Sequence, residues 1–337
     1  MASEAATMGW FASAASDGSA VDVETPWRAT EFATFPMRAR SMDPSATLAS
    51  LSPHQRARFW RYLRDTYGAH YPEFAAIFHH LDVHFPQYCR VKELFESFEA
   101  SQLVAAQLLT AQRQGRPIDA VYDLACGHGL VGLLLAYRFP RKRVVCVDLE
   151  RRPAFDALAA ASAAEGLPYT GDGGGGGASP LSNVEYREGD LNDVVGELTS
   201  SSCAVAVHAC NDANRDVVAG ARQRGALWAV MPCCIRAKGY LPLCSVEAND
   251  DLRFTLLCGA LANEYGAQLV RTVDPAITGR PIFIAGGLDH ATSATELLEG
   301  NGGAAAGNAP ARAPKVRRLR PHNAAPMSMP KLSPGSS

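Results

Sequence analysis

The stretch VYDLACGHGLVG, from Val121 to Gly132, decides the fold. An apolar start leads to an acid, Asp123, and an apolar run follows the stretch from Leu133 to Tyr137. Its three glycines are Gly127, Gly129 and Gly132. The order predicts a buried strand, a glycine turn and a helix. Glycine suits this turn because it adopts positive φ readily, and because its missing Cβ lets a ligand approach the backbone N–H groups.

This glycine spacing fits two kinds of nucleotide cofactor. Taken alone it matches the dinucleotide fingerprint, in which a pyrophosphate lies at the helix N-terminus. Asp123 would repel a pyrophosphate, whereas its charge suits the ammonium and sulfonium groups of S-adenosylmethionine. The sequence therefore favours the methyl donor, and an NAD(P)-dependent oxidoreductase is the alternative enzyme.

The donor motifs resemble those of the class I S-adenosylmethionine-dependent methyltransferases. Asp123, Ala125, Gly127 and Gly129 resemble the family's first motif, with Ala125 where its first glycine is usual. The resemblance implies that acids after a second strand, 143–147, bind the ribose, and that an acid after a third strand, 184–187, contacts the adenine. The donor-binding residues it implies are Asp123, Ala125, Cys126, Gly127, Gly129, Asp148, Glu150, Asp190, Leu191 and His208.

Later periodic segments complete a seven-stranded sheet. Further strands are predicted at 204–208, 227–231, 268–273 and 281–285, and helices at 153–164, 216–222 and 251–265. The last two strands have only a short link, which predicts an antiparallel hairpin. The predicted fold class is α/β: a doubly wound, Rossmann-like methyltransferase sheet with a terminal antiparallel hairpin and a helical N-terminal extension.

Four segments are predicted along the chain: a mobile N-terminal arm (1–50), a helical extension (51–116), the S-adenosylmethionine-binding domain (117–288) and a disordered basic tail (289–337). Ser52, Pro53 and Gln55 have the order of a capping box at a helix start. A second helix is predicted at 91–109. Five consecutive glycines, 173–177, predict a loop insertion because glycine costs most to hold in a fixed conformation.

Composition narrows the class of protein. The 337 residues are 47% apolar and 20% charged, as in ordinary globular proteins, and the net charge of −2 gives no global sign of a nucleic-acid binder. No apolar run reaches the roughly 20 residues that span a bilayer, so no membrane partner is expected.

Nine cysteines without a secretory signal favour a reducing, cytoplasmic location, and the Ala/Ser-rich start leaves plastid targeting as the alternative. The oligomeric state is not predicted.

Two groups of basic residues are candidates for contact with RNA. A helix from residue 53 carries Arg56, Arg58, Arg61 and Arg64, and the charged residues between 310 and 337 are all basic. A solvated helix face and a solvated tail are the simpler interpretation. RNA contact by both is the alternative, and it would be sensitive to salt.

Histidines 79, 80 and 84 lack the acid-plus-histidine pattern of a zinc protease and predict no metal site.

A second cluster, HACND (208–212) and MPCC (231–234), follows the fourth and fifth strands. Ligands of open α/β sheets lie beyond these strand ends, so this cluster should face the methyl group. It resembles the tRNA acceptor-stem 2′-O-methyltransferases and their relatives with a glutathione-transferase-like extension, which implies tRNA as acceptor. The zinc-binding modules of the tRNA enzymes have no counterpart here, and Ile235 stands where they have histidine.

Three roles are open for the cluster. His208 and Asp212 are both candidates for a general base. Histidine is well suited to this role because it accepts protons near neutral pH. Zinc binding by His208, Cys210, Cys233 and Cys234 is disfavoured, since neighbouring side chains of an extended chain point in opposite directions, and no metal is predicted. Alternatively the cysteines only pack beneath the donor, or the Cys233 thiolate attacks the acceptor.

The function has two further candidates besides RNA methylation and dinucleotide-dependent oxidoreduction. One is a methyltransferase whose acceptor is a protein or a small molecule. The second is a scaffold that binds S-adenosylmethionine without catalysis. Such a scaffold would have lost a residue of the donor site, and the donor motifs of this chain are complete apart from Ala125.

Overall fold

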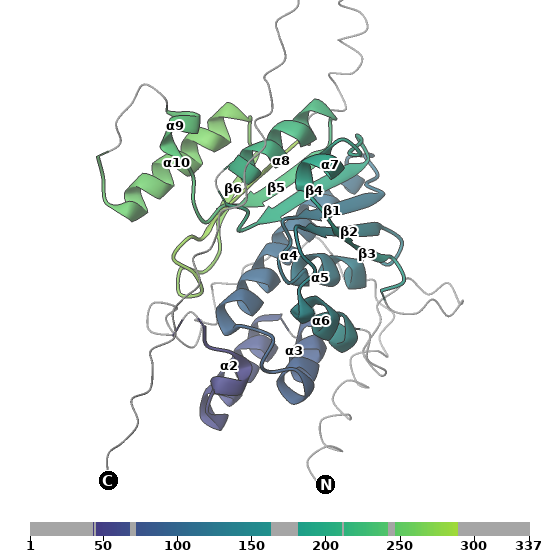
Figure 1. Ribbon diagram of the computed structural model, residues 1–337, viewed down its shortest axis with the longest axis vertical. Coiled ribbons are helices and arrows are strands. Elements are labelled where there is room, and N and C mark those ends of the chain that lie inside the picture. The colour runs from purple at the N-terminus through teal and green to yellow at the C-terminus, as the bar shows by residue number, and fades with distance from the viewer. Residues whose placement is uncertain are drawn as a thin grey trace, which may run out of the picture. The chain divides into compact units, whose positions relative to one another are not determined.

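A computed structural model of the chain describes residues 43, 45–67, 72–162, 181–210, 212–241 and 247–288. Its centre is a seven-stranded sheet in the order β3-β2-β1-β4-β5-β7-β6 (Figure 1). The strands are β1 Ala120–Leu124, β2 Arg143–Asp148, β3 Val184–Glu188, β4 Ser202–Val207, β5 Leu227–Met231, β6 Leu269–Thr272 and β7 Ile282–Gly286. The first five strands pair in parallel, whereas β7 is antiparallel to both β5 and β6. The predicted fold class and its terminal hairpin are confirmed.

Helices cover both faces of the sheet (Figure 1). Along β1, Val121 and Tyr122 are both buried but belong to different apolar clusters, as the alternation of side chains in a strand requires. On the Val121 face are α2 Pro53–Tyr67, α3 Pro72–His84, α4 Val91–Arg113, α5 Leu130–Arg138 and α6 Pro153–Ser162. On the Tyr122 face are α7 Leu191–Val195, α8 Asp212–Gln223 and α10 Asp250–Glu264. Short turns of helix, η2 Leu48–Ser50 and α9 Ala237–Tyr240, complete the described elements.

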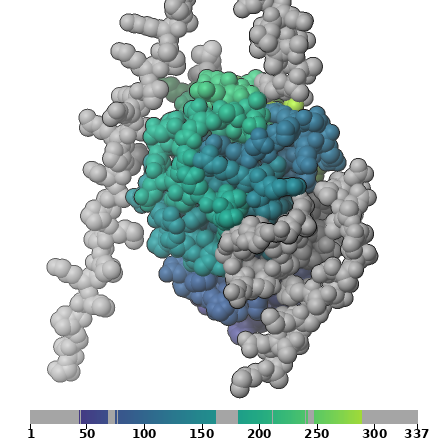
Figure 2. Space-filling view, turned by 90° about the vertical axis from the view of Figure 1, so that its right-hand side faces the viewer, coloured from purple at the N-terminus to yellow at the C-terminus, as the bar shows by residue number. Residues whose placement is uncertain are grey.

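The helical extension shares one apolar core with the sheet domain. The Phe59 ring of α2 lies 5.3 Å from the Phe95 ring of α4, and both belong to the cluster that includes Val121 of β1. In Figure 2 the blue surface of the extension runs directly into the teal surface of the sheet domain. Leu48 is also fully buried in this core, so the packed structure includes residues that the sequence assigned to the N-terminal arm.

Local signals set several element ends. At the start of α2 the predicted capping box forms, because Gln55 Oε1 accepts from the Ser52 amide at 2.9 Å and Ser52 Oγ accepts from the Gln55 amide at 3.3 Å. Helix α4 runs past the predicted end at residue 109 and stops before Gly115, which has a left-handed φ of 75°. Helix α8 begins at Asp212 and contains the segment 216–222 that the sequence assigns to a helix.

Some predictions fall outside the described residues. These are most of the N-terminal arm, the glycine insertion at 173–177, Asn211 and the basic tail at 289–337. None of the helices that the structure describes has both the length and the apolar character needed to cross a bilayer.

Candidate active site

A cavity of about 730 Å³ lies where β1, β4 and β5 end. Because these strands are parallel, their carboxyl ends meet at one edge of the sheet, which is where ligands of doubly wound folds bind. The volume is in the range of small-molecule sites. Residues of helix α4 and of the chain before it also line the cavity. Of the residues predicted for the site, those in the wall are Asp123, Ala125, Cys126, Gly127, His208, Cys210 and Cys233.

The three glycines of the turn serve two purposes, close packing of α5 and access for a ligand. Gly127 has a φ of 58°, and a Cβ added to it would meet nothing within 4 Å, so the missing side chain leaves open space at the cavity. A Cβ on Gly129 would lie 2.6 Å from the Phe155 ring, and one on Gly132 would lie 2.4 Å from Cys146 Sγ. Gly129 and Gly132 therefore permit close packing of α5, and Gly127 permits approach of a ligand.

Two residues of the cavity wall other than glycine adopt the left-handed region. Ala125 has a φ of 55° and His208 a φ of 59°. Such backbone costs on the order of 1–3 kcal/mol and is found mainly at functional sites. For Ala125 it also gives the physical reason why glycine is usual at this place in the motif.

Asp123 is buried beneath the turn. Its Oδ2 accepts a hydrogen bond from the Gly132 amide at 2.9 Å, which ties the strand to α5. Burial raises the pKa of Asp123 to about 7; the Gly132 hydrogen bond opposes this rise, and the neighbouring carboxylate of Asp148 adds to it. A cation in the cavity would stabilise the ionised carboxylate and a phosphate would not.

Asp148 fastens the glycine turn to the end of β2. Its Oδ2 accepts from the Gly127 amide at 2.7 Å, and its Oδ1 accepts from the Leu149 amide at 2.8 Å. The Gly127 N–H, which would donate to a pyrophosphate in a dinucleotide site, is therefore already bonded to a carboxylate.

The other predicted donor residues lie outside the wall of this cavity, and most of them follow the ends of β2 and β3. Glu150 is exposed, and its carbonyl oxygen accepts from the Tyr186 hydroxyl at 2.8 Å. Asp190 caps α7 by accepting from the Asn192 amide at 2.9 Å, and Leu191 is the first residue of that helix. Gly129 and Asp148 also stand outside the wall.

Two glutamates of α4 face histidines at the cavity, and the sequence prediction missed both. Glu96 is 1% exposed, and its Oε2 lies 3.0 Å from His208 Nε2, while its Oε1 lies 3.1 Å from Lys92 Nζ. Burial alone would raise the pKa of Glu96, but the hydrogen bond and charge of His208, followed by Lys92, bring it below its usual value. One turn earlier, Glu93 Oε2 lies 3.8 Å from His128 Nε2.

The sequence carries a signal for these acids. Glu93, Glu96 and Glu99 recur at every third position among the apolar residues of α4; Glu96 and Glu99 are buried with those residues, and Glu93 is half-buried. A buried acid requires partners, and those of Glu96 are Lys92 and His208. Glu96 Oε2 lies next to Nε2 of His208, so Nδ1 is the ring nitrogen that remains for another partner.

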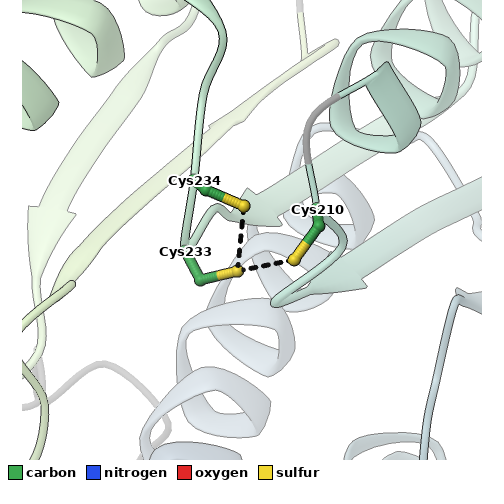
Figure 3. Close-up of side chains that lie close together, drawn as sticks. All are labelled: Cys210, Cys233 and Cys234. Carbon is green, nitrogen blue, oxygen red and sulfur yellow. Dashed lines mark hydrogen bonds between the residues drawn. The ribbon is translucent and has the colours of Figure 1, made fainter. Parts of the chain in front are cut away.

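Three cysteine sulfurs converge at the ends of β4 and β5 (Figure 3). Cys210 Sγ lies 3.0 Å from Cys233 Sγ, which lies 3.7 Å from Cys234 Sγ. Hydrogen bonding from Cys233 lowers the pKa of Cys210 to about 6 against the effect of burial, with smaller contributions from Cys234 and His208. The pKa of Cys233 is raised, chiefly because its thiol donates to Cys210.

This cluster corrects two expectations. The chain bends at Cys233, so the sulfurs of the adjacent cysteines lie together and do not point in opposite directions as in an extended strand. His208 does not belong to the sulfur group, because its ring faces Glu96. Asp212, the other predicted base, lies outside the cavity wall, where it accepts from Arg236 at 3.0 Å.

Comparisons with known proteins find likeness in solved structures alone. No protein-family model and no curated protein sequence matches the chain. A fibrillarin/Nop5p complex matches at 12% identity over 53% of this chain and 79% of that chain, with a TM-score of 0.34. A precorrin-6y C5,15-methyltransferase from Geobacter metallireducens matches at 13% identity over 55% and 86%, with a TM-score of 0.30. A 16S rRNA (adenine(1408)-N(1))-methyltransferase from Catenulisporales acidiphilia matches at 14% identity over 53% and 88%, with a TM-score of 0.32. Nothing about the acceptor of this chain follows from them.

Proposed function

We propose that the protein is an S-adenosylmethionine-dependent methyltransferase. The observation that carries the proposal is the bond between Asp148 and the Gly127 amide, with Asp123 buried beside it. Two carboxylates occupy the turn that a dinucleotide would need for its pyrophosphate, which disfavours the oxidoreductase alternative. The same charges favour a cofactor that carries an ammonium and a sulfonium group.

The donor would bind along the carboxyl edge of the sheet. In this arrangement the open space at Gly127 admits it, Asp123 attracts its positive charge, and the acids at the ends of β2 and β3 accept from its ribose and adenine. When bound, it supplies an electrophilic methyl group. Much of the rate of an in-line displacement comes from holding the acceptor collinear with the methyl carbon, which is the task of the cavity walls.

His208 is proposed as the general base. Glu96 pairs with Nε2 of His208, which leaves Nδ1 to take the proton of a hydroxyl or amine acceptor as the methyl group arrives. The left-handed backbone of His208 and the burial of Glu96 hold this pair in place.

RNA, with tRNA first, is the proposed acceptor, and a protein or small molecule is the alternative. Arg58, Arg61 and Arg64 are exposed on α2 and support contact with phosphates. Arg56 does not contribute to that face, because its Nε donates to the Leu48 carbonyl at 3.0 Å. None of the eight cysteines that the structure describes forms a disulfide, which supports the proposed cytoplasmic location.

Calorimetric titration with S-adenosylhomocysteine tests the donor site. The wild-type chain should bind with micromolar affinity, and Asp148→Ala should bind at least about tenfold more weakly because the turn loses its anchor. Asp156→Ala is the matched control, since this acid of α6 is exposed and pairs with Arg151. Binding of a nicotinamide cofactor, with no heat from S-adenosylhomocysteine, would overturn the proposal.

Radiolabelled methyl transfer to separate RNA, protein and small-molecule fractions then identifies the acceptor. Label in the RNA fraction supports the proposed acceptor. Label confined to another fraction replaces it without affecting the donor site.

A further inference from the structure

The three converging thiols belong to no step of the proposed methyl transfer. Cys210 follows β4, and Cys233 and Cys234 follow β5, so two neighbouring parallel strands present them at the same edge of the sheet (Figure 3). Their three sulfur atoms lie within 4.8 Å of one another. Cys210 and Cys233 stand in the wall of the cavity, which makes this side of the cluster accessible to small ions.

We propose that Cys210, Cys233 and Cys234 form a zinc site. Thiolate sulfur is a preferred ligand of Zn²⁺, which has no geometric preference of its own and adapts to the positions offered. Zn–S bonds of about 2.3 Å in a tetrahedral site place two sulfurs about 3.8 Å apart. The Cys233–Cys234 separation of 3.7 Å matches this value, the Cys210–Cys233 separation of 3.0 Å is shorter, and all three sulfurs lie within 4.8 Å, so side-chain rotations that part Cys210 from Cys233 would admit the ion.

The surroundings of the cluster leave one zinc position for another ligand. Among the described residues no carboxylate or imidazole joins the three sulfurs. The Cys210 and Cys233 thiols each lie 3.6 Å from the His208 carbonyl oxygen, as donors to it. Three protein ligands with an open fourth position are the pattern of zinc sites that bind water or a substrate. In this protein the fourth coordination position would face the cavity, where a water molecule, a hydroxyl or a thiol group could occupy it.

Metal binding is measured directly on the full-length reduced protein after removal of metal with a chelator. Titration with Zn²⁺ against a chromophoric indicator should give one equivalent of bound zinc with nanomolar or tighter affinity at neutral pH. Cys210→Ser, Cys233→Ser and Cys234→Ser should each weaken binding by more than about 100-fold, since even the loss of an outer-shell partner costs 10–100-fold. Cys126→Ser, which removes another half-buried thiol from the cavity wall, should bind zinc as the wild type does.

Cobalt substitution counts the sulfur ligands. The Co²⁺ form should have sulfur-to-metal charge-transfer absorption of three thiolates, and each single variant of the cluster should have that of two. The metal site is wrong if the wild type takes up no zinc, or if all four variants bind zinc equally. It is also wrong if the protein isolated without reductant contains a Cys210–Cys233 disulfide and no zinc. None of these results depends on binding of S-adenosylhomocysteine, so the two proposals fail separately.

Discussion

His208 is a residue whose backbone and side chain are both constrained. Its φ is left-handed, its amide donates to the Met231 carbonyl at 2.8 Å, and its ring faces a buried carboxylate. Such constraint costs stability, and the cost is consistent with a ring held in one orientation for chemistry.

Replacement of Glu96 tests this role. In Glu96→Gln the ring loses its charged partner, so kcat should fall about 10- to 100-fold with KM for the donor little changed. Glu93→Gln, whose carboxylate lies 3.8 Å from His128, is the matched control. An unchanged kcat in Glu96→Gln would assign Glu96 a purely structural role.

Asp123 should make donor affinity depend on pH. Its pKa is raised to about 7, so the carboxyl is largely neutral at pH 6 and ionised at pH 8. A cationic donor prefers the ionised form, so its affinity should rise about tenfold over this interval. Calorimetry with S-adenosylmethionine at several pH values measures the rise, and Asp123→Asn should abolish it. The same rise in Asp123→Asn would show that another group is responsible.

At the scale of elements, α5 packs on β2 through a glycine. A Cβ on Gly132 would meet Cys146 Sγ at 2.4 Å and Asp123 Oδ2 at 3.1 Å, so Gly132→Ala forces the helix away from the strand. The free energy of unfolding should fall by about 1–3 kcal/mol, as for other overpacked sites.

Gly259 is a control for the Gly132 substitution, because a side chain there has room and should stabilise the protein. It is exposed within α10, and a Cβ there would meet nothing within 4 Å. Gly259→Ala should therefore raise the free energy of unfolding by about 0.5–1 kcal/mol, because alanine restricts the unfolded chain and favours helix. Urea denaturation measures both variants. Equal effects of the same sign would refute the packing argument for Gly132.

The elements themselves could be predicted from the sequence. Short apolar runs between turn signals give the strands, and the short link before the last strand gives its antiparallel pairing. The glycine turn could be assigned because its conformation depends on residues adjacent in sequence. The pairing of Glu96 with His208 and the geometry of the three sulfurs could not be assigned. The first depends on how α4 packs against the end of β4, and the second on a bend at Cys233.

At the scale of the whole molecule, the predicted extension and the sheet domain should unfold as one unit, because one apolar core joins them. Trp60 in α2 and Trp228 in β5 provide a fluorescent probe in each part. In a variant that keeps only Trp60 or only Trp228, the fluorescence transition should have the same midpoint and slope as the circular dichroism transition of that same variant. Separate midpoints would mean that 51–116 is an independent domain after all.

The same core has a consequence for any shortened form of the protein. A chain cut at residue 117 keeps every motif by which a methyl-donor site is identified in the sequence. It loses α4, and with it the carboxylate that orients His208 and a wall of the cavity. It also uncovers the apolar face against which Phe95 and Phe98 pack, so such a fragment would aggregate. We therefore expect the smallest fragment with the proposed activity to begin before Leu48, well upstream of the motifs that would be used to define it.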